Sequence, residues 1–135
     1  MSTVFGLRGE KVKQYTLTAS TTLTTSHSEG EVNIATDAKV LTLPLITADL
    51  IGMSYLIRNT GADGNNIITI SPNALDGING TISNATADSV ASGVVDKDFV
   101  NTKATSNKGD FVEIIAVALT AWYIKGGVGI WASQA

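Results

Sequence analysis

The chain has no cysteine and a single histidine among its 135 residues, and these absences remove several kinds of chemistry. Without cysteine there is no disulfide framework, no thiol nucleophile and no thiolate metal ligand. A histidine metal site or a Ser-His-Asp triad would depend on His27 alone. The surrounding sequence, Ser26 to Gly30, is typical of a polar turn. We therefore expect His27 to be a turn residue, and we expect the protein not to be an enzyme.

Charge is also scarce, because Asp, Glu, Lys and Arg make up 16% of the chain, against about 25% in typical globular proteins. A surface this poor in Lys and Glu lacks the groups that are usually depleted from interface cores, so part of it could be buried against other copies. The net charge is -3, whereas phosphate binding needs clustered Lys or Arg. The basic residues Arg8, Lys11 and Lys13 are interleaved with Glu10 and fit a solvated arm. We expect no nucleic-acid partner.

Long apolar runs are missing as well, since nowhere do about 18 apolar residues occur together. The first eight residues lack the basic start and apolar run of a signal peptide. We expect a chain that is made in the cytoplasm, stays soluble and has no membrane partner. Its length suits one domain. Gly6 and Gly9 argue against a helix at the start, so we expect an extended arm over residues 1–13 and an all-β domain over residues 14–135.

The residues that are present alternate between apolar and polar with a period of two, which indicates β-strands with one buried face. The count of about eight short strands, without a convincing amphipathic helix, predicts a single antiparallel sandwich, jelly-roll or barrel-like domain. We find no internal repeat at a solenoid period. The expected strands cover residues 14–25, 31–36, 40–43, 55–59, 67–71, 111–119 and 122–125, with weaker signals at 81–83, 94–102 and 126–131.

Turn signals predict how these strands connect. Residues 60–66 are rich in Gly, Asn and Asp, so we expect 55–59 and 67–71 to form a hairpin. Residues 111–119 and 122–125 are expected to form the final hairpin. Residues 45–53 allow one helical turn. Residues 74–91 have no long periodic run and are expected to be a long surface excursion, of the kind that is often functional or interfacial.

Carboxylates offer the remaining candidates for chemistry. Asp96 with Asp98, or Asp63 with Asp76, could be paired for glycoside hydrolysis. Each lies in a hydrophilic turn or at a strand edge, where Asp commonly bonds its own backbone, so we prefer a turn role. Residues 76–80 resemble a fragment of a calcium loop but lack the further oxygen ligands and the bidentate Glu. We expect no catalytic residues, no metal site and no cofactor.

Several motifs together resemble a known module. They are the runs Leu41 to Pro44, Tyr55 to Gly61 and Gly64 to Ile70, followed by the glycine turn at 76–80 and Ala121-Trp122-Tyr123-Ile124. This pattern is similar to a β-module of tailed-bacteriophage virion proteins, found in capsid decoration (cement) proteins and in tail-fibre tips. The similarity covers roughly the last two-thirds of the chain. Because its motifs are turns and strands, it indicates architecture better than function.

The resemblance implies a homotrimer that binds the major capsid protein on the outer surface of the head, synthesised in the host cytoplasm and located in the virion. In that case we expect the arm to bind the capsid through Val4, Phe5, Leu7 and Arg8. We expect the trimer interface to contain Gly127, Gly129, Ile130 and Trp131. The alternative is a receptor-binding (glycan-binding) module of a tail fibre or spike, acting through loops such as 73–92. The absence of a coiled-coil or β-helical shaft favours decoration, and a small glycan hydrolase comes third.

Overall fold

The computed structural model describes residues 11–134, and this part of the chain is built from strands with three short 3-10 turns and no longer helix. The 3-10 turns are η1 Thr25–Glu29, η2 Ala48–Leu50 and η3 Lys103–Thr105. The strands are β1 Lys13–Leu17, β2 Thr21–Thr22, β3 Gly30–Ile34, β4 Lys39–Thr42, β5 Ser54–Asn59, β6 Ile68–Ser71, β7 Gly77–Ile82, β8 Ser89–Ser92, β9 Phe99–Asn101, β10 Phe111–Ala118, β11 Ala121–Val128 and β12 Trp131–Ser133.

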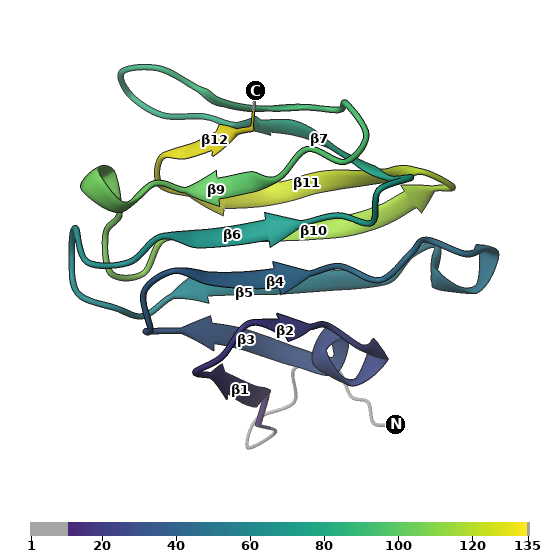
Figure 1. Ribbon diagram of the computed structural model, residues 1–135, viewed down its shortest axis with the longest axis horizontal. Helices are drawn as coiled ribbons and strands as arrows, with labels where there is room; N and C mark the ends of the chain where they lie inside the picture. The colour runs from purple at the N-terminus through teal and green to yellow at the C-terminus, as the bar shows by residue number, and fades with distance from the viewer. Residues whose placement is uncertain (1–10, 135) are drawn as a thin grey trace.

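These strands form two sheets that enclose the core (Figure 1). The larger sheet has the order β1-β3-β5-β10-β11-β7-β8, and the smaller has the order β12-β9-β6-β4-β2. The alternating apolar residues meet between them, with Val32, Ile57 and Ile114 from the larger sheet and Leu41 and Ile70 from the smaller one fully buried. The expectation of an all-β fold is confirmed.

The sheets are mixed, so the expectation of an antiparallel domain is wrong. Strands β1, β3 and β5 are parallel in the larger sheet, and β2, β4 and β6 are parallel in the smaller one. Because the first six strands alternate between the sheets, the N-terminal half winds as three stacked coils (Figure 1). The register stacks Tyr15 on Val32 and Val32 on Ile57. The coils differ in length, since η2 lengthens the connection between β4 and β5, and no regular repeat is visible in the sequence.

The predicted hairpin of residues 55–59 and 67–71 is wrong, although both strands exist. Strand β5 pairs with β3 and β10 in the larger sheet, whereas β6 pairs with β4 and β9 in the smaller one. The segment between them crosses from one sheet to the other, and it buries Gly61 and Asn66. Turn residues show that the chain reverses, but they do not show that the two strands bond to each other.

The second predicted hairpin is confirmed, because β10 and β11 pair antiparallel from Phe111 opposite Val128 to Ala118 opposite Ala121. The first expected strand, residues 14–25, is divided into β1 and β2, which lie in different sheets. The segment 74–91 carries the antiparallel pair β7 and β8, so the expectation of one small strand there is wrong. Residues 126–131 do not form a separate strand: β11 runs to Val128, and β12 begins at Trp131. No helix among residues 11–134 is long and apolar enough to cross a membrane.

Candidate functional site: an apolar end and a polar hollow

Four connections meet at one end of the two sheets, on the right in Figure 1: β4–β5, β6–β7, β8–β9 and β10–β11. Asp76 holds three of them together. Its Oδ2 accepts a hydrogen bond from the Ile46 N–H at 3.0 Å, and its backbone carbonyl accepts one from the Asp96 N–H at 3.0 Å. The adjacent Gly77 N–H donates to the Thr120 carbonyl at 2.9 Å. These bonds fix the four loops as one continuous surface.

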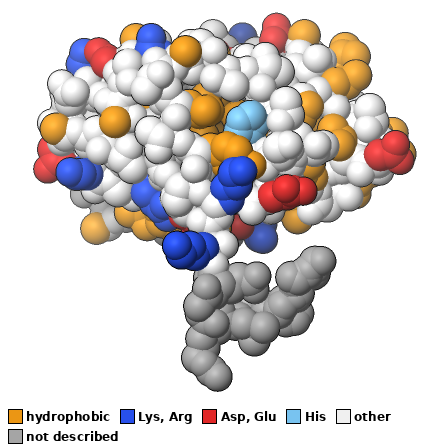
Figure 2. All heavy atoms as spheres, turned by 90° about the horizontal axis from the view of Figure 1, so that it is seen from below, with side chains coloured by type: hydrophobic (Ala, Val, Ile, Leu, Met, Phe, Trp, Pro, Cys, Tyr) orange, Lys and Arg blue, Asp and Glu red, His pale blue; other side chains and the backbone are white. Residues whose placement is uncertain are grey.

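That surface is apolar. Of the thirteen large hydrophobic side chains that are exposed within residues 11–134, six lie on these four connections and a seventh, Val117, lies near the end of β10. Their exposed fractions run from 42% to 64%. Figure 2 shows hydrophobic side chains gathered along the right-hand edge, which is the same end of the molecule. We call this set the apolar end: Leu45, Ile51, Leu75, Val94, Val95, Val117 and Leu119. Exposed apolar side chains that gather at one end of a molecule commonly mark an interaction surface.

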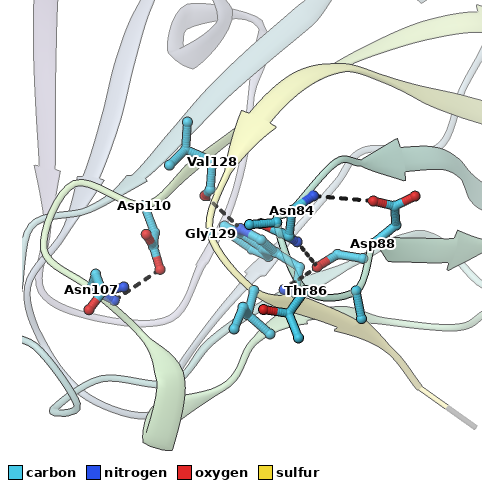
Figure 3. Close-up of a pocket in the computed structure, with 12 residues that line it drawn as sticks. Asn84, Thr86, Asp88, Asn107, Asp110, Val128 and Gly129 are labelled. Atoms are coloured by element: carbon cyan, nitrogen blue, oxygen red, sulfur yellow. Dashed lines mark hydrogen bonds between the residues drawn. The ribbon is translucent and has the colours of Figure 1, made fainter.

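The opposite end carries a hollow of about 540 Å³ between the β7–β8, β9–β10 and β11–β12 turns (Figure 3). One wall is polar, formed by residues 84–89 together with Asn107 and Asp110. The other wall is the segment Val128 to Trp131. Within residues 11–134, neither lysine, arginine nor histidine lines it. The hollow therefore combines carboxylates, amides and hydroxyls with aliphatic carbon.

Hydrogen bonds fix the polar wall. Asp110 is 3% exposed, and its Oδ2 accepts from the Asn107 N–H at 2.9 Å and from Asn101 Nδ2 at 3.2 Å. Asp88 Oδ1 accepts from the Asn84 N–H at 3.2 Å, and Asn84 Nδ2 donates to Ser89 Oγ at 3.0 Å (Figure 3). Short loops rich in Asn, Asp and Ser fold this way because such side chains bond nearby backbone groups.

The glycine-rich tail makes its close approaches within its own chain. Gly129 has φ +107°, and a Cβ there would lie 2.5 Å from Asp110 Oδ2. A Cβ at Gly127 would lie 2.8 Å from the Phe111 carbonyl oxygen. Trp131 is 2% exposed, and its ring stacks on Phe99 with the centroids 5.4 Å apart.

Among the residues expected at a trimer interface, Ile130 is thus the exposed one with a large side chain, at 45%. Trp131 has almost no surface left for a neighbour. The interface itself stays a prediction. Val4, Phe5, Leu7 and Arg8, expected to bind the capsid, lie outside the described residues.

Of the sequence candidates for chemistry, Asp63 and Asp76 are not brought together. Asp63 Oδ1 accepts from the Lys108 N–H at 2.7 Å near the hollow, whereas Asp76 is buried at the apolar end. Asp96 and Asp98 lie in the β8–β9 connection, where the Asp98 N–H donates to Gln134 Oε1 at 3.1 Å. Within residues 11–134 no group of three His, Cys, Asp or Glu side chains could hold a metal ion.

His27 lies in η1, where its Nδ1 accepts a hydrogen bond from the Thr24 N–H at 3.0 Å and its ring contacts Tyr15 edge-on at 4.9 Å. This is the turn position that the sequence predicts for it. The contact places His27 against the first coil, and the residue does not line the hollow.

Shifted pKa values occur where charges are paired for structure. Arg58 donates to Glu31 Oε1 at 2.9 Å and lowers the pKa of Glu31, with a further contribution from Gln14. Lys103 pairs with Asp37 and lowers the pKa of that carboxyl group. Neither carboxylate lines the hollow. We assign a structural role to these ion pairs, which join neighbouring strands and turns.

In comparisons with known proteins, no protein-family model matches the chain, and neither does any curated protein.

Sequence patterns point to one part of the hollow, since residues 84–89 lie in the long segment 74–91. They do not point to Asn107 and Asp110, and they assign Gly129 to a trimer interface. The sequence signal for Asn107 and Asp110 is the polar cluster at 105–110, and that cluster by itself predicts only a turn.

Proposed function

We propose that this chain is a non-catalytic structural protein of a bacteriophage virion, a capsid decoration protein that binds the outer surface of the head as a homotrimer and stabilises the shell. The observation that carries the proposal is the apolar end. Seven exposed aliphatic side chains, six on four bonded loops and one at the end of β10, suit attachment to a protein surface. The phage assignment rests on the sequence resemblance of residues 41–124 to virion β-modules.

The energetics of the apolar end fit such attachment. Complete burial of a Val, Leu or Ile side chain stabilises by about 1.5–3 kcal/mol. Seven side chains that are about half exposed therefore offer on the order of 5–10 kcal/mol, from which the cost of association has to be subtracted. One copy would bind a capsid weakly. Three linked copies would bind far more tightly, because the second and third contacts become intramolecular.

The other expected contacts keep their places in this proposal. Val4, Phe5, Leu7 and Arg8 would add a second capsid contact. Ile130 would lie in the trimer interface with Gly127 and Gly129, and Trp131 would support that segment from the core. A trimer that spans a joint between capsid subunits stabilises that joint, because the surface between trimer and capsid is buried only when the shell is assembled.

The test combines solution mass with binding to empty heads assembled from the major capsid protein of the parent phage. We expect the purified chain to have a mass near three chains by light scattering. The double variant Leu75→Gln, Leu119→Gln should keep that mass and lose at least tenfold in co-sedimentation with heads. The matched control is Val40→Gln, Val90→Gln, which changes exposed apolar residues outside the apolar end. A monomer would contradict the trimer, and unchanged binding by the first variant would contradict the docking surface.

The second candidate is a receptor-binding module of a tail fibre or spike that recognises glycan. The hollow favours it, because one wall lies in the 73–92 segment where such recognition is expected. The three parallel coils also reduce the objection that the chain lacks a β-helical element. Loss of glycan binding without loss of head binding would separate the two candidates.

A further inference from the structure

We propose that the hollow between the β7–β8, β9–β10 and β11–β12 turns binds a neutral polyhydroxy ligand, one or two sugar rings, with Asp110 and Asp88 accepting hydrogen bonds from its hydroxyl groups. This inference rests on the second candidate function and names the ligand class and its contacts. It is independent of capsid binding. The volume of about 540 Å³ lies within the range of small-molecule sites.

Asp110 provides the strongest acceptor. Its carboxyl group is buried in the wall of the hollow, and both described donors, the Asn107 N–H and Asn101 Nδ2, reach the same oxygen, Oδ2. Oδ1 receives no hydrogen bond from residues 11–134. A carboxylate oxygen has room for two donors, so Oδ1 is free to accept hydrogen bonds from a ligand. A ligand hydroxyl that enters the hollow can satisfy it.

The absent side chain of Gly129 lets the β11–β12 turn pack directly against this carboxyl group. A Cβ at that position would lie 2.6 Å from Asp110 Oδ1, so any other residue would displace the carboxyl group from the wall of the hollow. The left-handed backbone of Gly129, φ +107°, sets the β11–β12 turn against the carboxyl group.

Across the hollow, Asp88 is exposed, and its Oδ1 is already bonded to the Asn84 N–H, which leaves Oδ2 for a ligand. The side chains of Thr86 and Asn107 also line the space and make no hydrogen bond within residues 11–134. Together these groups offer two carboxylate acceptors, one amide and one hydroxyl. Such a mixture suits a ring that carries several hydroxyls, each of which can both donate and accept.

The aliphatic wall suits the C–H face of a sugar ring. Val128 and Ile130, on either side of Gly129, are 52% and 45% exposed. The aromatic ring of Trp131 is buried, so the described lining offers no aromatic stacking platform and the affinity should be modest. Because that lining has two carboxylates and no basic residue, it repels phosphate, sialic acid and uronic acid. The charge therefore selects neutral ligands.

The experiment is a 1H-15N NMR titration with methyl galactoside, N-acetylglucosamine and lactose, and with N-acetylneuraminic acid as the acidic comparison. We expect at least one neutral sugar to shift amides of residues 84–88, 107–110 and 128–131, with no response to the acidic sugar. Asp88→Asn should weaken binding at least fivefold at unchanged melting temperature. Asp49→Asn, an exposed carboxylate in η2 at the apolar end, is the matched control and should bind normally.

Gly129→Ala tests the contribution of the Asp110 carboxyl group, which the added Cβ displaces, and it should abolish binding while Asp88→Asn only weakens it. The absence of shifts with every neutral sugar at 50 mM would overturn the inference, as would shifts outside the hollow or equal binding of the acidic sugar. Loss of head binding by Asp88→Asn would also overturn it, since the hollow would then be a protein contact. Normal trimer mass and head binding together with failed sugar binding would refute this site alone.

Discussion

Asn59 and Asn101 join the two sheets through a buried hydrogen bond, with Asn59 Nδ2 donating to Asn101 Oδ1 at 2.8 Å. Asn59 ends β5 in the larger sheet, and Asn101 ends β9 in the smaller one. Both residues are fully buried. Asn101 Nδ2 also donates to Asp110 Oδ2, so the side chain that links the sheets also positions the carboxyl group of the hollow.

We expect Asn59→Ala to lower the free energy of unfolding by roughly 2–4 kcal/mol, because it leaves buried partners unpaired. These include Asn101 Oδ1 and the Gly61 N–H, which donates to Asn59 Oδ1 at 2.9 Å. Urea unfolding measures the loss. Asn107→Ala is the control, since that side chain is exposed, and should change stability by less than about 0.5 kcal/mol. Equal effects of the two variants would contradict a bonded link between the sheets.

Trp131→Ala should destabilise each chain by about 3–5 kcal/mol, because the ring is buried against Phe99. The loss should not depend on protein concentration. Tyr123→Ala, which removes a half-exposed ring from β11, should have a much smaller effect. A Trp131→Ala protein with normal monomer stability but no trimer would instead place Trp131 in the interface.

Gly129→Ala should be more destabilising than Gly109→Ala, although both glycines have positive φ. Gly109, with φ +100°, has open space where a Cβ would lie, so its variant has only the backbone strain of about 1–2 kcal/mol. In the Gly129 variant the new Cβ also collides with Asp110, which should lower the free energy of unfolding by about 1–3 kcal/mol more. Thermal unfolding of both variants measures the two losses of stability. Equal losses would mean that the Asp110 carboxyl group moves aside freely.

Stability should fall in alkaline solution because of Tyr55. Burial raises the pKa of its hydroxyl to about 12 from the ordinary 10.0. In the unfolded chain the group ionises first, so its contribution is complete below pH 10 and is lost as the pH rises from 10 to 12, by up to about 2 kcal/mol. Urea unfolding at pH 9, 10 and 11 should show this loss.

Tyr55→Phe should flatten that pH dependence, because no ionisable group remains at this position. At pH 7 it should cost about 1 kcal/mol through the lost hydrogen bond from the Tyr55 hydroxyl to the Thr24 carbonyl, 3.0 Å long. The control, Tyr123→Phe, alters an exposed side chain and should keep the wild-type profile. An unchanged alkaline slope in Tyr55→Phe would assign the loss to other groups.

Local sequence patterns predict the strands well where one face is buried. Strand β5 shows this, because Tyr55, Ile57 and Asn59 are buried and the residues between them are less so. In β7 the same rule fails, since its glycines interrupt the pattern. Gly77 and Gly80 lie where a Cβ would collide with Gly93 and Ile124, so packing selected glycine over the usual strand residues.

The candidate sites are predictable only in part. The segment 74–91 draws attention because it lacks a long apolar period, and one wall of the hollow is found there. The remaining walls come from turns at 105–110 and 128–131, which are ordinary in sequence. The apolar end is likewise assembled from four loops, none of which has more than two of its seven exposed residues.

The amino-acid order by itself determined that the chain is β, that residues 111–119 and 122–125 form a hairpin and that His27 lies in a turn, because those features depend on neighbours along the chain. The tertiary structure decided the partners: the parallel pairing of the first strands, the separation of β5 from β6, and the placement of Asp88 and Asp110 in one hollow. A period of two reports which face of a strand is buried. Which strand lies beside it depends on core packing and on hydrogen bonds such as that between Asn59 and Asn101, which link residues distant in sequence.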